Sequence, residues 1–145
     1  MDENKSRNQP VEILIVDDNQ VDALILKKSL SKTRFKNNVH IINDGEKTLD
    51  FVFCRNEFKD RIKLPKPDLI LLDIKLTGID GIEVLKILKE DPKYCDIPVI
   101  MVTNYNDEET IDKCYQYGCA GYFHKPIKFE IFVRVFDGFL FLGII

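Results

Sequence analysis

Leu69-Ile70-Leu71-Leu72-Asp73 is the most informative segment of this chain. Four consecutive apolar residues, preceded by Pro67 and Asp68, predict a short strand that is buried on both faces of a parallel sheet. In an open α/β sheet, ligands bind at the carboxyl ends of the strands, so Asp73 would stand at the mouth of a site. The alternative is that Asp73 only caps the turn that follows. Which of these two interpretations holds depends on the other residues expected to lie near Asp73.

The composition is that of an ordinary globular protein with one domain. The 145 residues are 45% hydrophobic and 31% charged, and the net charge of −3 argues against a DNA-binding surface. Residues 1–10 are polar and predict a flexible leader rather than a signal peptide, and no apolar run approaches the ~18 residues of a membrane span. We therefore expect a cytoplasmic protein that binds neither DNA nor a membrane.

The four cysteines do not form a metal-binding pattern. Cys54, Cys95, Cys114 and Cys119 include no CxxC pair and have no neighbouring histidine at metal spacing. We expect them to be small buried apolar residues in a reducing compartment.

Short strands alternate with amphipathic helices along the chain. Strands are expected at Val11–Val16, Val39–Ile42, Leu69–Leu72, Ile97–Val102 and Cys119–His124. Helical periodicity follows each of them, with N-caps expected at Asp44, Asp80 and Asn106 and a last helix from about Ile127. The charged, proline-ended segment 56–66 is expected to be a loop. Five strands alternating with five helices predict a doubly wound, three-layer α/β domain with a parallel sheet.

Polar residues with related chemistry follow four of the five strands. They are Asp17, Asp18, Asp73, Thr103 and Lys125. Three crowded carboxylates repel one another, and an oxygen-only ligand set suits Mg²⁺, which would offset the repulsion. A carboxylate can act as the nucleophile toward a phosphoryl donor if a metal, a lysine and a hydroxyl neutralise the transferred oxygens. Singly, each residue also has an ordinary explanation, as a helix cap, a strand terminus or a solvated charge.

The motifs together resemble a known family. Val16-Asp17-Asp18-Asn19, Leu72-Asp73-Ile74-Lys75-Leu76, Asp80-Gly81, Val102-Thr103 and Lys125-Pro126-Ile127 resemble, in order and spacing, the receiver domains of two-component response regulators. The resemblance covers residues 11–145, including a C-terminal helix and an apolar tail. It implies a flavodoxin-like sheet with strand order 2-1-3-4-5.

The resemblance also implies the chemistry of the site. Asp73 would accept a phosphoryl group from a histidine kinase. Asp18, Asp73 and the backbone carbonyl of Lys75 would bind Mg²⁺ directly, and Asp17 would act through water. Such a domain is a phosphoacceptor that signals to a downstream protein, and not an enzyme with a substrate of its own.

Three further positions complete what the resemblance implies. Thr103 and Lys125 would contact the phosphoryl group, and the Lys125-Pro126 peptide bond would be cis. Tyr122 falls where the family keeps its switch aromatic. Thr77 is a departure, since many receivers have proline there, but it does not touch the chemistry.

Within the family, the chain looks most like the single-domain regulators of cyanobacterial-type phytochrome histidine kinases. The grounds are Asp18-Asn19-x-x-Asp22, the aromatic Phe51-Val52-Phe53-Cys54-Arg55 before a long loop, and the aromatic C-terminus. From Ile127 onward the apolar residues cover more of a helix than one sheet face requires. We expect this surface to form a homodimer, unless the tail folds back over its own domain or the chain is a fragment of a longer protein whose missing part covers it.

Other functions fit the sequence less well. A haloacid-dehalogenase-type phosphatase needs a second aspartate two residues after the nucleophile, where this chain has Lys75. A flavin binder of the same fold needs a Ser/Thr/Gly phosphate loop after the first strand, where Asp17 and Asp18 would repel a phosphate. A degenerate receiver that serves only as an interaction module remains the alternative to phosphorylation.

Overall fold

The computed structural model describes residues 9–63, 65–141 and 143, without the side chains of residues 62, 63, 140 and 141. Its five strands are β1 (Val11–Val16), β2 (Asn37–Ile42), β3 (Leu69–Leu72), β4 (Val99–Thr103) and β5 (Gly121–His124). They form one parallel sheet in the order β2-β1-β3-β4-β5. This confirms the predicted fold class and strand order. Most of the predicted leader, and part of the predicted C-terminal tail, lie outside the described residues.

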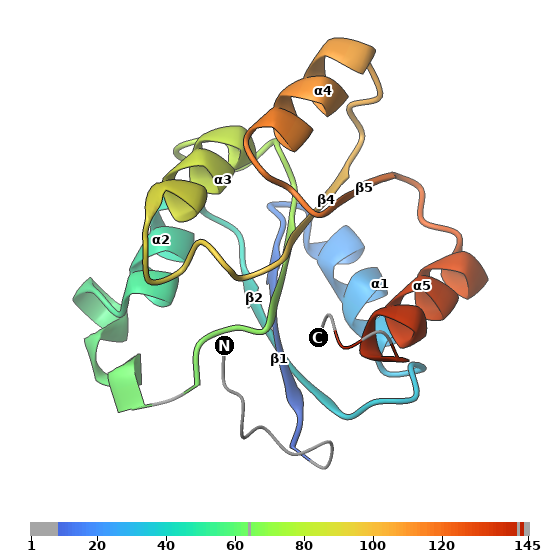
Figure 1. The fold of residues 1–145 in the computed structure, drawn as a ribbon, viewed down its shortest axis with the longest axis horizontal. Coiled ribbons are helices and arrows are strands. Elements are labelled where there is room, and N and C mark those ends of the chain that lie inside the picture. The colour runs from blue at the N-terminus through green and yellow to red at the C-terminus, as the bar shows by residue number, and fades with distance from the viewer. Residues whose placement is uncertain (1–8, 64, 142, 144–145) are drawn as a thin grey trace.

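Helices cover both faces of the sheet (Figure 1). They are α1 (Gln20–Leu30), α2 (Gly45–Phe53), α3 (Gly81–Glu90), α4 (Glu108–Gln116) and α5 (Phe129–Phe141). Helices α1 and α5 pack side by side on one face, and α2, α3 and α4 lie on the other. Within the described parts of the chain, no helix is both long and apolar enough to cross a membrane.

The apolar run of β3 supplies both halves of the core. Because side chains alternate along a strand, Leu69 and Leu71 pack with α1 and α5, whereas Ile70 and Leu72 pack with α2 and α3. All four are at most 1% exposed. Burial on both faces explains why this strand has no polar alternation, and it places Asp73 at the first position beyond the core.

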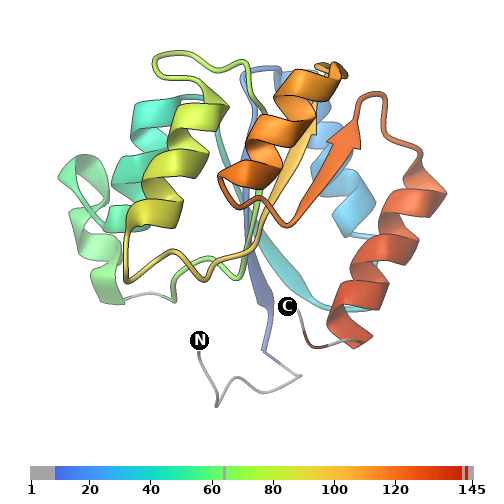
Figure 2. The same ribbon diagram turned by 45° about the horizontal axis from the view of Figure 1, so that its top comes forward.

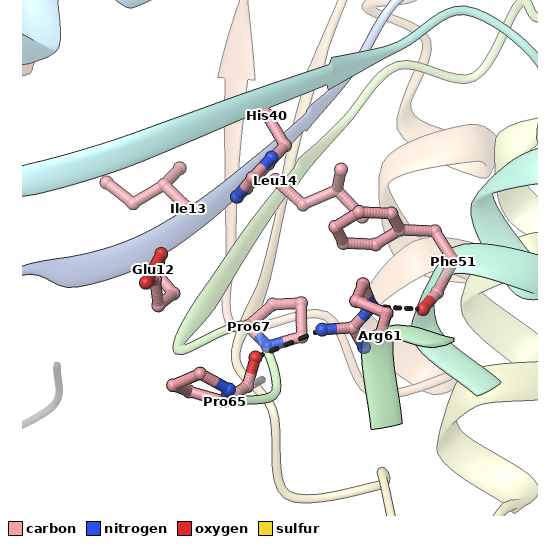
Figure 3. Close-up of a pocket in the computed structure, with 8 residues that line it drawn as sticks. All are labelled: Glu12, Ile13, Leu14, His40, Phe51, Arg61, Pro65 and Pro67. Atoms are coloured by element: carbon pink, nitrogen blue, oxygen red, sulfur yellow. Dashed lines mark hydrogen bonds between the residues drawn. The ribbon is translucent and has the colours of Figure 1, made fainter. Parts of the chain in front are cut away.

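The segment after α2 differs from the prediction. It was expected to be a loop from Asn56 to Lys66, but Asn56–Lys63 forms a 3₁₀ helix, η1. Arg61 stabilises it by donating to the carbonyl oxygens of Phe51 (2.7 Å) and Pro65 (3.0 Å) while its guanidinium lies 4.3 Å from the centre of the Phe51 ring. Figure 3 shows Arg61 beside Phe51 in a small cavity at the amino edge of the sheet, with Glu12 and His40 on its other walls.

Several element boundaries also differ from the prediction. Strand β4 begins at Val99 because Pro98 has no N–H to donate, and α5 begins at Phe129. Helix α4 is capped by Asp107 rather than Asn106, since the Asp107 carboxylate accepts hydrogen bonds from both the backbone N–H (3.0 Å) and the hydroxyl (2.6 Å) of Thr110. The other two predicted caps are correct: Asp44 accepts from the N–H of Lys47 and Asp80 from that of Glu83.

The prediction for the cysteines was half right. Cys114 and Cys119 are buried, and burial raises the pKa of the Cys114 thiol to about 11. Cys54 is half-buried and Cys95 is exposed, because they lie in the connections after α2 and α3 rather than on a face that packs against the sheet. All four are free thiols.

Candidate functional site

The carboxyl edge of the sheet brings the predicted site residues together. The hydrogen bonds of the sheet continue one residue past β1, β3 and β5: the N–H of Asp17 donates to Ile42, that of Asp73 to Val16, and that of Lys125 to Thr103. These bonds fix the backbone from which each side chain projects. In Figure 2 the arrowheads of β4 and β5 point to this edge.

The Lys125 ammonium group is the centre of the site. It donates to carboxylate oxygens of Asp17 (2.7 Å), Asp73 (2.9 Å) and Asp22 (2.9 Å). The side chains of Lys125 and Asp73 are each 7% exposed and that of Asp17 is 1% exposed, so these charges interact where water screens them little. An ammonium group has three N–H donors, and all three are occupied.

Backbone donors hold the second oxygen of both buried carboxylates. Asp17 Oδ1 accepts from the N–H of Asn19 (2.9 Å), and Asp73 Oδ1 accepts from the N–H of Ile74 (2.7 Å). Each carboxylate therefore turns its other oxygen, Oδ2, toward Lys125. Asp73 is thus oriented by the site as well as by the strand that carries it.

Burial and the neighbouring charges have opposing effects on the pKa values of Asp17 and of Lys125. Burial raises the pKa of Asp17 to about 6, although its hydrogen bond from Lys125 opposes the shift. For Lys125, burial alone would lower the pKa, but the hydrogen bonds to Asp17, Asp73 and Asp22 outweigh it and raise the pKa above its usual value. Lys125 therefore stays protonated and carries the positive charge of the site.

The acidic cluster fits a hard divalent cation. Carboxylate oxygens of Asp17, Asp18 and Asp73 lie within 4.8 Å of one another, and Asp18 is exposed to solvent. Oxygen-only ligands with an exposed member, where waters can complete the coordination, are what Mg²⁺ prefers. Lys75, whose carbonyl was predicted to be a further ligand, lies in the loop that follows Asp73. It lines a cleft together with Asp18, Asp73 and Lys125.

Gly81 allows that loop to lie close to the helix that follows it. A Cβ atom at this position would stand 1.9 Å from the Asp73 carbonyl oxygen, and the Gly81 N–H donates to the Ile74 carbonyl (2.7 Å). Only glycine permits this approach, so the start of α3 holds the backbone on the far side of Asp73.

The predicted switch residues lie on the neighbouring strands. Thr103 is fully buried at the end of β4, and its hydroxyl oxygen accepts a hydrogen bond from the N–H of Tyr105 (3.4 Å). The Tyr122 hydroxyl donates to the Tyr105 carbonyl (2.7 Å), and burial raises the pKa of Tyr122 to about 12. Tyr105 thus contacts both residues. The Lys125-Pro126 bond is cis, as predicted.

Asp22 is the site residue that the sequence reasoning missed. It was noted only as part of a family motif, but its carboxylate lies 2.9 Å from the Lys125 ammonium. The available signal was its position four residues after Asp18. The helix that carries Asp22 starts directly after the end of β1, so an acid in its first turn lies near the carboxyl edge of the sheet.

Comparison with protein-family models assigns the chain to a family. The model described as response regulator receiver domain matches residues 13–136. The chain belongs to the response regulator receiver domain family. The resemblance seen in the motifs is therefore confirmed, and the aspartates, threonine and lysine of this receiver come from a sheet whose strand order is that of the family.

The receiver is similar to curated response regulators. Response regulator Rcp1 of Synechocystis is 28% identical over 131 residues, which cover 90% of this chain and 87% of Rcp1. Two-component response regulator ARR3 of Arabidopsis thaliana is 32% identical over 123 residues, and these cover 81% of this chain but only 51%, about half, of ARR3. Relatives of this kind are signalling proteins.

The receiver is also similar to solved structures of response regulators. The Mn²⁺-bound form of Rcp1 matches the receiver with a TM-score of 0.78 at 28% identity, over 90% of this chain and 91% of that chain. The phosphorylated cyanobacterial phytochrome response regulator RcpA matches with the same TM-score and coverage at 27% identity. The bacteriophytochrome response regulator RtBRR is 32% identical, with a TM-score of 0.78 over 89% of this chain and 78% of its own.

Proposed function

We propose that this receiver accepts a phosphoryl group on Asp73 from a sensor histidine kinase, in a reaction that requires Mg²⁺. The observation that carries the proposal is the ammonium group of Lys125, which lies 2.9 Å from Asp73 Oδ2 inside a cluster of carboxylates. Phosphoryl transfer to an aspartate needs a carboxylate nucleophile, a lysine beside it and ligands for a divalent cation, and all three are present here.

In the proposed reaction, a carboxylate oxygen of Asp73 attacks the phosphorus atom of a phosphohistidine. A P–O bond forms and the P–N bond breaks, and the imidazole nitrogen keeps the bonding electron pair. Lys125 donates one hydrogen bond to a transferred oxygen, and the Thr103 hydroxyl donates a second. When bound, Mg²⁺ supplies further positive charge that offsets the charge on the phosphoryl group and on Asp17 and Asp18.

The proposed output is a phosphorylation-dependent change in the surface around α4. A new hydrogen bond to the phosphoryl group would draw Thr103 inward and free its oxygen from the N–H of Tyr105. The Tyr122 hydroxyl is bonded to the carbonyl of the same residue, so Tyr122 would turn with it into the space that Thr103 leaves. A downstream protein would read the altered surface, and no DNA contact is required.

For the kinase, we infer a phytochrome-type partner in the cytoplasm. The support is the likeness to RcpA and RtBRR, whose names identify them as regulators of phytochromes. Transfer from a purified phytochrome-type kinase should exceed transfer from an unrelated sensor kinase of equal autophosphorylation by about tenfold or more. Equal transfer from both would contradict this pairing.

We also propose that the receiver forms a homodimer through α5 and the tail. Phe132 and Phe136 are fully buried in their own domain, so the apolar surface available to a partner is smaller than the sequence suggested. Ile131 is nevertheless 49% exposed, and Val21 and Leu24 on the adjacent α1 are 65% and 53% exposed. Sedimentation should give a dimer for the intact chain and a folded monomer for Ile131→Asp and for a chain ending at Asp137. Equal masses for all three would refute the interface.

Phosphorylation is tested by incubating the protein with Mg²⁺ and a small phosphodonor, followed by intact mass measurement. We expect one added phosphoryl group, which is lost with a chelator and in Asp73→Asn. An unmodified wild-type chain would favour the interaction-module alternative, and a donor hydrolysed with many turnovers would favour a phosphatase. Persistent label in Asp73→Asn would place the acceptor elsewhere.

A further inference from the structure

We propose that Asp22 is a positioning residue for phosphoryl transfer, because its carboxylate anchors Lys125 so that one N–H of the ammonium faces the oxygen of Asp73 that reacts. The inference rests on the proposed function and concerns a residue outside the predicted site. It assigns to α1 a part in the chemistry, through a side chain that touches neither the acceptor nor the incoming phosphorus.

The argument begins with the geometry of the ammonium group. Its three N–H bonds point in fixed directions about Nζ, so two occupied donors determine where the third points. Asp17 (2.7 Å) and Asp22 (2.9 Å) take two of them, and the third reaches Asp73 (2.9 Å). With Asp17 alone, the side-chain torsions of Lys125 could change and carry Nζ away from Asp73, because one anchor fixes the position of Nζ less closely than two.

Asp22 is itself held in place. Its backbone N–H donates to the side chain of Asn19 (3.0 Å), the N-cap of α1, and the N–H of Asn19 donates to Asp17 Oδ1 (2.9 Å). The two anchors of Lys125 are therefore joined through one residue and move as a unit. The start of α1 thus sets the distance between them.

The same anchors serve after transfer. An Asp73 oxygen that has become the P–O bridge accepts hydrogen bonds poorly, so the third N–H is released to a phosphoryl oxygen without breaking the bond to Asp22. The side chain of Asp22 is 32% exposed, against 7% for Asp73, so it lies toward the rim of the cleft. From there it holds Lys125 without occupying the place of the phosphoryl group.

The competing explanation is that Asp22 only stabilises the helix. A carboxylate in the first turn of α1 interacts favourably with the helix dipole, as Glu46 does in the first turn of α2. Within the described residues, Lys125 Nζ bonds to Asp17, Asp22 and Asp73 and to no residue in the first turn of α2. Glu46→Gln therefore removes a charge of the same kind without touching Lys125, and it serves as the matched control for Asp22→Asn.

The test uses the full chain with Mg²⁺ and acetyl phosphate. In Asp22→Asn we expect the maximal rate of phosphorylation to fall about five- to tenfold. The half-saturating concentration of acetyl phosphate should stay level or fall, because one negative charge that repels the donor is gone. Asp22→Glu, which keeps the carboxylate, should recover part of the rate, and Glu46→Gln should match wild type.

A second readout is independent of transfer. In the unphosphorylated protein, the NMR signal of the Lys125 ammonium protons should exchange with water roughly fivefold faster in Asp22→Asn, because one of three charge-assisted hydrogen bonds is weakened. An unchanged exchange rate, or a maximal rate within about twofold of wild type, overturns the inference. If wild type takes up no phosphate, the proposed function fails, while the exchange measurement still decides whether Asp22 anchors Lys125.

Discussion

Replacing Lys125 by methionine should destabilise the unphosphorylated protein by about 3 kcal/mol near pH 7. Removing one partner of a buried ion pair typically costs about 3–5 kcal/mol, because the other charge is left unpaired. Here the loss leaves the carboxylates of Asp17 and Asp73 buried without their cation. We take the lower end because the third partner, Asp22, is 32% exposed and can be solvated. Methionine keeps most of the packing of the lysine stem.

Urea unfolding followed by circular dichroism measures the change directly. We expect a lower midpoint with an unchanged slope, and a fall of about 10 °C in thermal midpoint for a domain of this size. Lys32→Met, at an exposed lysine after α1, is the control and should change stability by less than about 0.5 kcal/mol. Such a difference would show that the cost comes from the site and not from the loss of a lysine.

The pH dependence provides a stricter check. Burial raises the pKa of Asp17 to about 6 from its ordinary value of 3.8, so the folded state binds this proton more tightly than the unfolded state. The contribution of Asp17 to stability therefore rises as pH falls through this window. Without Lys125 the pKa of Asp17 should be higher still, so the variant gains more from protonation and its deficit should shrink toward pH 5. A deficit below about 1 kcal/mol near pH 7, or one that grows on acidification, would refute the reasoning.

Three other predictions follow from the site and the core. Thr103→Ala should abolish phosphorylation-dependent partner binding while leaving phosphorylation measurable, and a pull-down in which binding is unchanged would exclude this route for the switch. Lys75 and Tyr105 border the cleft, where they would shield the acyl phosphate from water, so replacing both by alanine should speed phosphate loss about threefold or more in a mass-spectrometric decay assay; an equal decay rate would remove the argument. Cys95, which is exposed, should be alkylated well before Cys114 at mildly alkaline pH, because burial raises the pKa of the Cys114 thiol to about 11 and leaves little thiolate; peptide mapping that finds equal labelling would contradict the burial.

The fold and the site could be predicted because the sequence signals for both are local: each strand and the polar residue that follows it can be recognised separately. The uninterrupted apolar run of β3 indicates burial on both faces, and a parallel sheet places all strand ends at one edge. Once Asp17, Asp73 and Lys125 are assigned to strand ends, the topology brings them together without any knowledge of side-chain contacts. The ion pairs of Lys125 are the physical result of that placement.

What the sequence did not predict depends on contacts between distant or competing groups. Segment 56–66 looks like a charged loop, and its 3₁₀ helix depends on Arg61 reaching back to the Phe51 carbonyl and ring. Asn106 and Asp107 are both good caps, and the Thr110 hydroxyl decides between them. Asp22 reads as an ordinary acid in a first helical turn until Lys125, more than a hundred residues later, is placed beside it.

The central claim is that Asp73 is the phosphoacceptor, and mapping the modified residue tests it most directly. Borohydride reduces an aspartyl phosphate to homoserine, so tandem mass spectrometry of protein treated with Mg²⁺, acetyl phosphate and then borohydride identifies the acceptor. We predict homoserine at position 73 and aspartate retained at positions 17, 18 and 22. Homoserine at any of these other positions, or none anywhere in a chain that has gained a phosphoryl group, would contradict the account.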